Sequence, residues 1–321
     1  ENIIATGKEA IDSRKVAFLL ATPQQDGGQW DMIVSLFQKY GVVPKSVMPE
    51  SANSSNSRDL NNYLNKLLRK DAVVLRKMVA QGETLDAIEE KKEEMLESIY
   101  NFLSISLGTP PKEFDFEYRD EEKNYHLDRG LTPQIFYDKY IGVKLDDYVS
   151  VINAPTKDKP FNRSYTVEML GNVVGGKEVK YLNVDMETFK KLAIAQLEVG
   201  QSSTRTSGIM ALDAYSMDDL FDTDFTMTKA ERLDFGESLM THAMVLTGVD
   251  LVDGQSTKWK VENSWGEKVG KNGFFVMSDA WMDEYTYQIV VRKDLLTKEQ
   301  LNAFNEEPIV LSPWDPMGAL A

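Results

Sequence analysis

Hydrophobic and polar positions divide the chain into a helical first third and a β-rich last third. Leucines recur at helical spacing over residues 60–79, and a second amphipathic run covers residues 85–103. Gly82 separates the two runs. Residues three or four positions apart share one face of an α-helix, so the pattern predicts a charged helical hairpin over residues 57–107.

Shorter helices are predicted on both sides of this hairpin. Residues 31–40 carry apolar side chains at helical spacing, and Gly41 ends the run. Thr132-Pro133 is a typical start for a short helix reaching Tyr140, because proline suits the first helical turn. A further well-bounded helix is predicted over residues 185–200.

Runs rich in β-branched and aromatic residues predict strands, most of them past residue 238. The predicted strands are Tyr148–Ile152, Val173–Val174, Val179–Val184, Met240–Val249, Trp259–Glu262, Phe274–Met277 and Tyr287–Arg292. The fold class is therefore α+β. The tail from Glu306 carries three prolines and several apolar residues, which predicts an extended arm pinned along the surface.

Composition narrows the classes of function. The apolar fraction of 42% allows a sizeable core, and a net charge of -15 opposes binding to a phosphate backbone. The residues contain no cysteine, so no disulfide framework is expected. Only two histidines are present, which disfavours a multi-histidine metal site. The apolar runs are too short for a membrane span, and no signal peptide opens the chain.

One histidine lies where a catalytic base could be built. His242 starts an alternating apolar run and shares its strand face with Met244 and Leu246. Asn263 shares a strand face with Trp259 and Val261.

The connection between these two runs is rich in turn residues, which favours antiparallel neighbouring strands. That pairing would bring imidazole and carboxamide into hydrogen-bond reach. The amide oxygen would then fix the ring's tautomer and leave the other ring nitrogen for a nucleophile.

Each feature also has a commoner structural explanation. A lone histidine on an apolar strand face is usually a core residue, and Asn-Ser at a strand end is usually a turn. The second histidine, His126, lies in a charged stretch over residues 119–129 and is expected to be a solvated surface residue.

Taken together, the motifs resemble a known family. The Asn-Ser-Trp-Gly of residues 263–266, followed by Asn-Gly-Phe at 272–274, resembles the asparagine motif of papain-like peptidases. The Asp-Gly-Gly of residues 26–28 is similar to their substrate-binding turn. Longer strings narrow the resemblance to the aminopeptidase C / bleomycin hydrolase family, and they occupy residues 22–32, 202–205, 208–213 and 308–321.

The resemblance implies a papain-like fold with a helical insertion, in three parts. Residues 1–50 would be the remainder of the helical half with the substrate-binding turn, 51–130 the helical insertion, and 131–321 the β-rich half with a C-terminal arm.

The resemblance also assigns roles to individual residues. His242 matches the general base, Asn263 its orienting asparagine, and Trp265 the residue that shields their hydrogen bond. Gly27 and Gly28 match the turn that lets an extended peptide lie alongside. Ala321 matches the terminal residue whose carboxylate meets the substrate's free α-amino group.

Two expected parts of the family pattern are missing from the 321 residues. The nucleophilic cysteine and the oxyanion-hole glutamine are expected ahead of residue 1. Near Gly200 one helix runs straight into Gln201-Ser202, where the family has a strand, so we expect residues to be missing there as well.

The resulting hypothesis is a cytoplasmic thiol aminopeptidase acting on peptides with free N-termini. No metal or organic cofactor is implied, membrane association is not expected, and nucleic-acid binding is disfavoured by the charge. The resemblance implies a homohexamer. The rival hypothesis is a catalytically inactive, oligomeric peptide-binding protein that keeps the groove and lacks the nucleophile.

Overall fold

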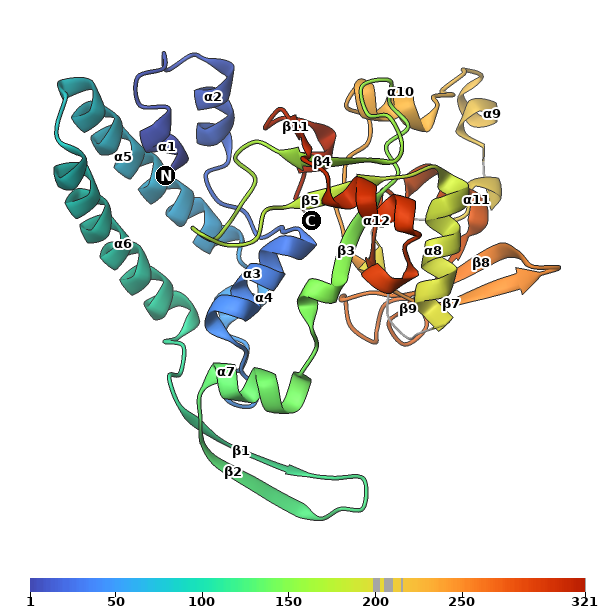
Figure 1. The fold of residues 1–321 in the computed structure, drawn as a ribbon, viewed down its shortest axis with the longest axis horizontal. Coiled ribbons are helices and arrows are strands. Elements are labelled where there is room, and N and C mark those ends of the chain that lie inside the picture. The colour runs from blue at the N-terminus through green and yellow to red at the C-terminus, as the bar shows by residue number, and fades with distance from the viewer. Residues whose placement is uncertain (199–202, 205–209, 215, 321) are drawn as a thin grey trace. The chain divides into compact units, whose positions relative to one another are not determined.

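The computed structural model describes residues 1–198, 203–204, 210–214 and 216–320 (Figure 1). The chain divides into two compact units. The first comprises Glu1–Gly27 and Ser35–Val143, and the second comprises Gly28–Val34 and Lys144–Ala321. Helix α3 (Trp30–Tyr40) begins in the second unit and ends in the first. The three-part division expected from the sequence stays a prediction.

The first unit is dominated by the predicted helical hairpin, which is confirmed. Helices α5 (Arg58–Gln81) and α6 (Leu85–Leu107) lie side by side (Figure 1). Gly82 ends α5 in the left-handed region, with φ 75°, where a residue without Cβ is favoured. The buried apolar stripe between the helices includes Leu75, Ile88 and Met95. The shorter helices of this unit are α1 (Asn2–Ala5), α2 (Arg14–Ala21) and α4 (Ala52–Ser55).

The same unit holds a β-hairpin that the hydrophobic pattern did not predict. Strands β1 (Phe114–Arg119) and β2 (Tyr125–Leu131) pair in antiparallel fashion. Phe116 packs on Phe136 and Tyr140, with ring centroids 5.0 and 4.9 Å apart. These partners lie on α7 (Pro133–Phe136) and the following π-helical turn (Tyr137–Ile141). In β1 the aromatic residues alternate with charged ones, so the aromatic side chains share one face of the strand.

The second unit is built on a mixed five-stranded sheet with the order β10-β3-β5-β4-β11. Its strands are β10 (Gln288–Arg292), β3 (Tyr148–Ile152), β5 (Lys180–Asn183), β4 (Arg163–Val167) and β11 (Ile309–Leu311). Strand β3 has the predicted bounds, whereas the predicted strand at Val173–Val174 is wrong. Val174 is 74% exposed in a turn that ends at Gly175, φ 73°.

A second, antiparallel sheet carries the candidate chemistry. Its order is β6-β7-β8-β9, with β6 at Ser203–Thr204, β7 at Met244–Val252, β8 at Gln255–Glu262 and β9 at Phe274–Ser278. The suspected gap near Gly200 falls on residues outside the described ones. The sequence predicted the last three strands, with bounds shifted by up to four residues at one end.

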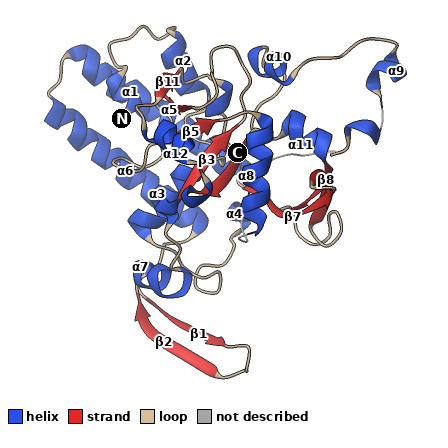
Figure 2. Cartoon of the chain, turned by 45° about the vertical axis from the view of Figure 1, so that its right-hand side comes forward, coloured by secondary structure: helices blue, strands red, loops and turns tan. Residues whose placement is uncertain are grey.

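Helices complete the second unit. Helices α8 (Met186–Glu198) and α12 (Lys298–Asn305) lie against the five-stranded sheet (Figure 2). The remaining helices are α9 (Met217–Phe221), α10 (Lys229–Asp234), α11 (Asp279–Tyr285) and 3₁₀ turns at Leu145–Asp147, Leu212–Ala214, Lys293–Leu295 and Pro316–Gly318. No helix in the described part of the chain combines the length and apolarity that crossing a bilayer requires.

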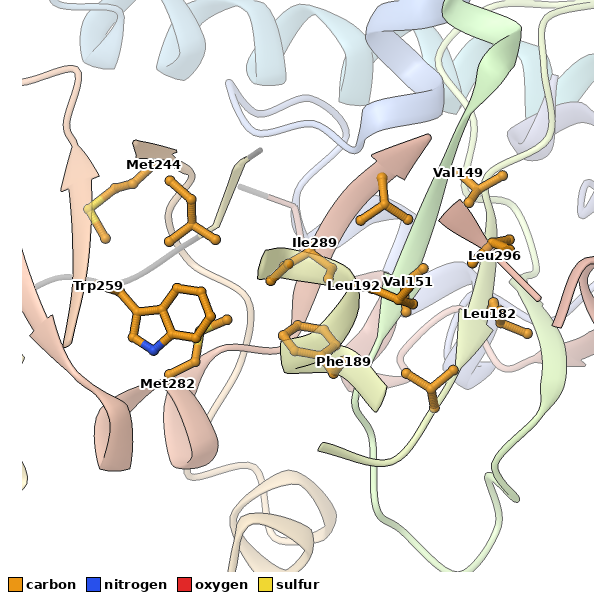
Figure 3. Packing of buried hydrophobic residues seen from close by; sticks show 14 of the residues in the cluster. Val149, Val151, Leu182, Phe189, Leu192, Met244, Trp259, Met282, Ile289 and Leu296 are labelled. Atoms are coloured by element: carbon orange, nitrogen blue, oxygen red, sulfur yellow. The ribbon is translucent and has the colours of Figure 1, made fainter. Parts of the chain in front are cut away.

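One apolar core joins the two sheets of this unit (Figure 3). Val151 and Ile289 enter it from the five-stranded sheet, Phe189 from α8, and Met244 and Trp259 from the antiparallel sheet. Trp259 is fully buried. A buried aromatic side chain of this size contributes much of the local burial energy, so the core holds the site-bearing sheet in place.

The indole of Trp259 is anchored by a partly buried polar network. Asp279 Oδ1 accepts hydrogen bonds from Trp259 Nε1 at 2.9 Å and from Ser256 Oγ at 2.6 Å. Asp279 Oδ2 accepts one from Lys190 Nζ at 2.8 Å. Burial raises the pKa of this carboxyl, but the three hydrogen bonds outweigh burial, so its pKa lies below the ordinary value.

We predict that Asp279→Asn lowers the free energy of unfolding by about 1–3 kcal/mol at pH 7, because an amide NH2 replaces one of the two acceptor oxygens and leaves a partly buried donor without its partner. A carboxyl with a lowered folded pKa stabilises the fold above its ordinary pKa of about 4 and loses that effect as pH falls further. Urea unfolding at pH 7 and at pH 3 should therefore show the difference from wild type shrinking in acid. Asp253→Asn, at an exposed left-handed turn position, is the matched control. If the difference in unfolding free energy between wild type and Asp279→Asn stays constant with pH, the stabilisation does not come from the ionised carboxylate.

Candidate active site

His242 lies two residues before β7, on the strand face predicted from the sequence. Met244 and Leu246 on that face are 3% and 2% exposed, whereas Val245 between them is 46% exposed. The imidazole itself is half-buried. Strand β7 starts at Met244 and not at Met240, so the histidine sits in the segment that enters the sheet.

Asn263 follows β8 directly and is 7% exposed. Trp259 and Val261 on the same face are both fully buried, as the alternation predicted. The register of β7 and β8 pairs Leu246 with Val261, and extending it places Asn263 opposite Met244. His242 is then a diagonal neighbour of the asparagine, a separation that long side chains can bridge.

The two side chains meet in a hydrogen bond of 2.8 Å between His242 Nε2 and Asn263 Oδ1. An amide oxygen only accepts, so the hydrogen lies on Nε2, an assignment that follows from the partner. This tautomer leaves a lone pair on Nδ1. The arrangement can hold an imidazole ready to take a proton at Nδ1.

Trp265 packs beside the imidazole of this pair. Its ring centroid lies 5.0 Å from that of His242, with the planes inclined by 32°. Phe275 of β9 supports the indole edge to face, at 6.2 Å and 88°. The indole is 48% exposed, and where it contacts the imidazole it keeps water from that side of the ring. Excluding water strengthens a hydrogen bond, because the local dielectric constant falls.

The loop between β8 and β9 is closed by a tight turn and by a backbone hydrogen bond to Asn263. The Asn263 N–H donates to the carbonyl of Gly273 at 2.9 Å. Asn272 and Gly273 have φ values of 55° and 85°, the signs required by a type I′ hairpin turn. Gly270 also has a positive φ, and a Cβ there would lie 2.5 Å from the carbonyl oxygen of Phe274. These residue types are therefore required for the turn that places Asn263.

The segment leading to His242 is held by two buried cations that the sequence analysis missed. Lys229 Nζ donates to the carbonyls of Asp283 and Thr286, both at 2.8 Å, at the C-terminus of α11. Arg232 Nη2 donates to the carbonyl of Glu284 at 3.0 Å. Burial lowers the pKa of Lys229 well below its ordinary value, against the opposing charge of nearby carboxylates. Lys229 and Arg232 lie on the short helix α10, and no sequence pattern there predicts that these charged side chains are buried.

Downstream of α10, two further contacts fix the approach to the histidine. The Tyr287 hydroxyl donates to Ser238 Oγ at 2.6 Å, and Met240 is 2% exposed in the apolar cluster of the five-stranded sheet. His242 therefore follows an anchored segment and not a free loop.

The glycine turn precedes α3. Gly28 has no positive φ, and a Cβ added to it would meet nothing within 4 Å. Its bare backbone is therefore not required by internal packing or strain, which agrees with a surface kept open for a ligand. Gly27 belongs to the first unit and is half-buried.

The C-terminal tail is pinned, as the sequence predicted, but it is extended only in part, because a bend at residues 313–315 and the 3₁₀ turn Pro316–Gly318 interrupt it. It begins with β11 at the edge of the five-stranded sheet. Met317 is fully buried, and its carbonyl accepts from the Tyr181 hydroxyl at 3.0 Å. The carbonyl of Ala319 accepts from Gln29 Nε2 at 2.5 Å, next to Gly28. Ala321, the predicted terminal site residue, lies outside the described residues.

A cavity of about 770 Å³ in the second unit lies elsewhere, and neither His242 nor Asn263 lines it. One charged residue of its lining, Lys190, contacts Asp279 and Asp283, each at 2.8 Å. His126 lies on β2 in the first unit, where its ring stacks on Tyr118 and contacts the Asp120 carboxylate at 2.8 Å.

We predict that the ring N–H of His242 is protected from exchange with water by Asn263 and Trp265. Proton NMR at neutral pH should show a slowly exchanging imidazole N–H, and Asn263→Ala should abolish it because the acceptor is gone. Trp265→Ala should accelerate its exchange while leaving the hydrogen bond in place. His126→Gln removes the other histidine and supports the assignment. A protected signal that survives Asn263→Ala would show that another group holds the ring.

Comparisons with known proteins identify the family of this chain. The family model described as the Peptidase C1-like family matches residues 1–318. An aminopeptidase C from Streptococcus thermophilus is 62% identical over 332 residues, covering 100% of this chain and 75% of the relative. An aminopeptidase C from Lactococcus lactis subsp. lactis is 60% identical over 326 residues, covering 98% and 74%.

The same relation holds in three dimensions. The crystal structure of pepW from Lactobacillus rhamnosis superposes with a TM-score of 0.97 at 61% identity, covering 100% of this chain and 75% of that one. The α+β fold is therefore papain-like, and the chain belongs to the Peptidase C1-like family.

Proposed function

We propose that this chain carries the general base and the orienting asparagine of a cysteine aminopeptidase, an enzyme that removes N-terminal residues from peptides. The observation that carries the proposal is the His242–Asn263 hydrogen bond, which presents Nδ1 as a proton acceptor under the cover of Trp265. The relatives named aminopeptidase C, 62% and 60% identical, support the enzyme class.

The reaction needs a thiolate, and the 321 residues contain no cysteine, so the sulfur must come from outside them. In the proposed mechanism Nδ1 of His242 takes the thiol proton, and the thiolate attacks the carbonyl carbon of the first peptide bond. A C–S bond forms, the C–N bond breaks, and the imidazolium returns its proton to the leaving amine. Water, activated by the same imidazole, then hydrolyses the thioester and regenerates the thiol.

Asn263 acts in both half-reactions without exchanging a proton. Its amide oxygen holds the ring orientation and stabilises the imidazolium through the Nε2 hydrogen bond. We further propose that an extended peptide lies along Gly27 and Gly28, where no side chain intervenes.

Preference for a free N-terminus is assigned to the arm. The carboxylate of Ala321 would pair with the substrate's ammonium group. This pair would be a charge-assisted hydrogen bond, which an acetylated amino group could not form. The position of Ala319 beside the glycine turn supports this assignment. A cytoplasmic location, inferred from the family resemblance, is part of the proposal, and no metal or organic cofactor enters the mechanism.

We predict that His242→Ala, in the protein that includes the cysteine, lowers kcat by roughly 10³-fold or more, because the base and later acid is removed. Hydrolysis of an aminoacyl-linked fluorogenic substrate under reducing conditions measures this. His126→Ala is the matched control, since its histidine lies on β2 and takes no part in the proposed chemistry. Thermal unfolding of both variants checks that the fold is intact. Retention of most activity by His242→Ala would remove the proposed role.

The same assay separates the enzyme from its rival, an inactive peptide-binding protein. An active wild type whose turnover is blocked by a thiol alkylating reagent supports the peptidase. Peptide binding without any turnover in reduced protein would favour the rival.

We also propose that the protein is a homohexamer. Helices α5 and α6 leave large apolar side chains in solvent, which supports an interface there: Tyr63 is 66%, Leu85 74%, Tyr100 56% and Ile105 79% exposed.

Sedimentation velocity at micromolar concentration should give one species with the mass of six chains. Ile105→Glu should shift it towards smaller species, because a charge would be buried at the interface. Val174→Glu changes an equally exposed residue in a turn of the other unit and should leave the hexamer intact. A wild-type monomer would refute the assembly.

A further inference from the structure

We infer that Gln29 is a positioning residue that holds the end of the C-terminal arm against the glycine turn and thereby sets the preference for a free amino group. The inference deepens the proposed aminopeptidase function and rests on it for the substrate preference. It also has a structural consequence that can be tested without any turnover.

The first observation is the placement of the Gln29 side chain. Gln29 follows Gly28 directly, precedes α3 and is 6% exposed. Its Nε2 donates to the carbonyl of Ala319 at 2.5 Å, across 290 positions of sequence. The contact is partly buried, and loss of the donor would leave the Ala319 carbonyl without this partner, so the contact favours the observed position of the arm.

The second observation is a series of anchors at alternate residues of the arm. The Asp315 carboxylate lies 2.9 Å from Nζ of Lys159, which is 4% exposed. The carbonyl of Met317 accepts from Tyr181, and that of Ala319 accepts from Gln29.

Of these three anchors of the described arm, Gln29 differs from the other two in its location. Lys159 lies in the loop before β4, and Tyr181 lies on β5, so both tie the arm to the five-stranded sheet. Gln29 instead lies on the segment that contains Gly28, and it holds the last of the three anchored residues. It therefore links the arm directly to the proposed substrate turn.

Chain geometry shows why this last anchor governs reach. Ala319 is extended, with φ -61° and ψ 138°, and an extended chain advances about 3.3 Å per residue. The Gln29 contact moves the last anchor from Met317 to Ala319, so losing it lengthens the untethered end by two residues. A longer untethered end samples more positions, and misplacement of about 1 Å is enough to reduce a positioned interaction strongly.

The structural test uses the 321-residue chain and carboxypeptidase digestion followed by mass spectrometry. Gln29→Met keeps the side-chain length and removes the donor, so release of Ala321 and Leu320 should become roughly three- to tenfold faster. Gln81→Met, the same change at an exposed helix end, should digest like wild type. Equal rates for Gln29→Met and wild type would overturn the inference.

The functional test uses the protein that includes the cysteine, with one peptide in free and N-acetylated forms. The ratio of kcat/KM for the free over the acetylated peptide should fall roughly three- to tenfold in Gln29→Met. Gln29→Glu should lower the ratio further at neutral pH, because a carboxylate cannot donate to the Ala319 carbonyl. Its ratio, relative to wild type, should recover as acid protonates the carboxyl, and Gln29→Met should show no such recovery.

A purely structural role for Gln29 would lower both rates equally and leave the ratio unchanged, which would overturn the positioning role. Thermal unfolding of each variant identifies a general loss of fold. If wild type shows no preference for the free amine, the proposed function fails, and the substrate preference assigned to Gln29 fails with it. The digestion result then still decides whether Gln29 holds the arm.

Discussion

The hydrogen bond between His242 Nε2 and Asn263 Oδ1 depends on the register of two strands. Both residues lie just outside β7 and β8, so the ladder places them without including them. A one-residue slip would turn the faces over and separate imidazole from amide. The buried side chains at Met244, Trp259 and Val261 prevent that slip, because each would have to leave the core.

Much of this arrangement could be predicted from the sequence because it follows from local periodicity. Period-two burial placed His242 and Asn263 on their strand faces, and helical spacing gave the α5–α6 hairpin with its break at Gly82. The chemistry of the side chains also predicted that the amide oxygen of Asn263 would accept the hydrogen bond from the imidazole. The Asn272-Gly273 turn is likewise encoded locally, since both residues tolerate positive φ.

The features that escaped prediction depend on tertiary contacts. Strand β1 alternates aromatic with charged residues, and its apolar face is covered only once α7 packs against it. Lys229 and Arg232 are buried cations because the carbonyls at the end of α11 receive them. Tertiary partners of this kind override the usual preference of charged side chains for solvent.

The arm combines two kinds of interaction that do different work. Burial of Met317 is strong and non-directional, so it holds the arm on the sheet without fixing its axial position closely. Hydrogen bonds to Met317 and Ala319 are directional and weaker, yet they specify which carbonyl faces which donor. Under the proposed function, a carboxylate held at a fixed distance from the substrate needs the directional kind of interaction nearest to it. The structure has this order, with the buried side chain first and the Gln29 hydrogen bond beyond it.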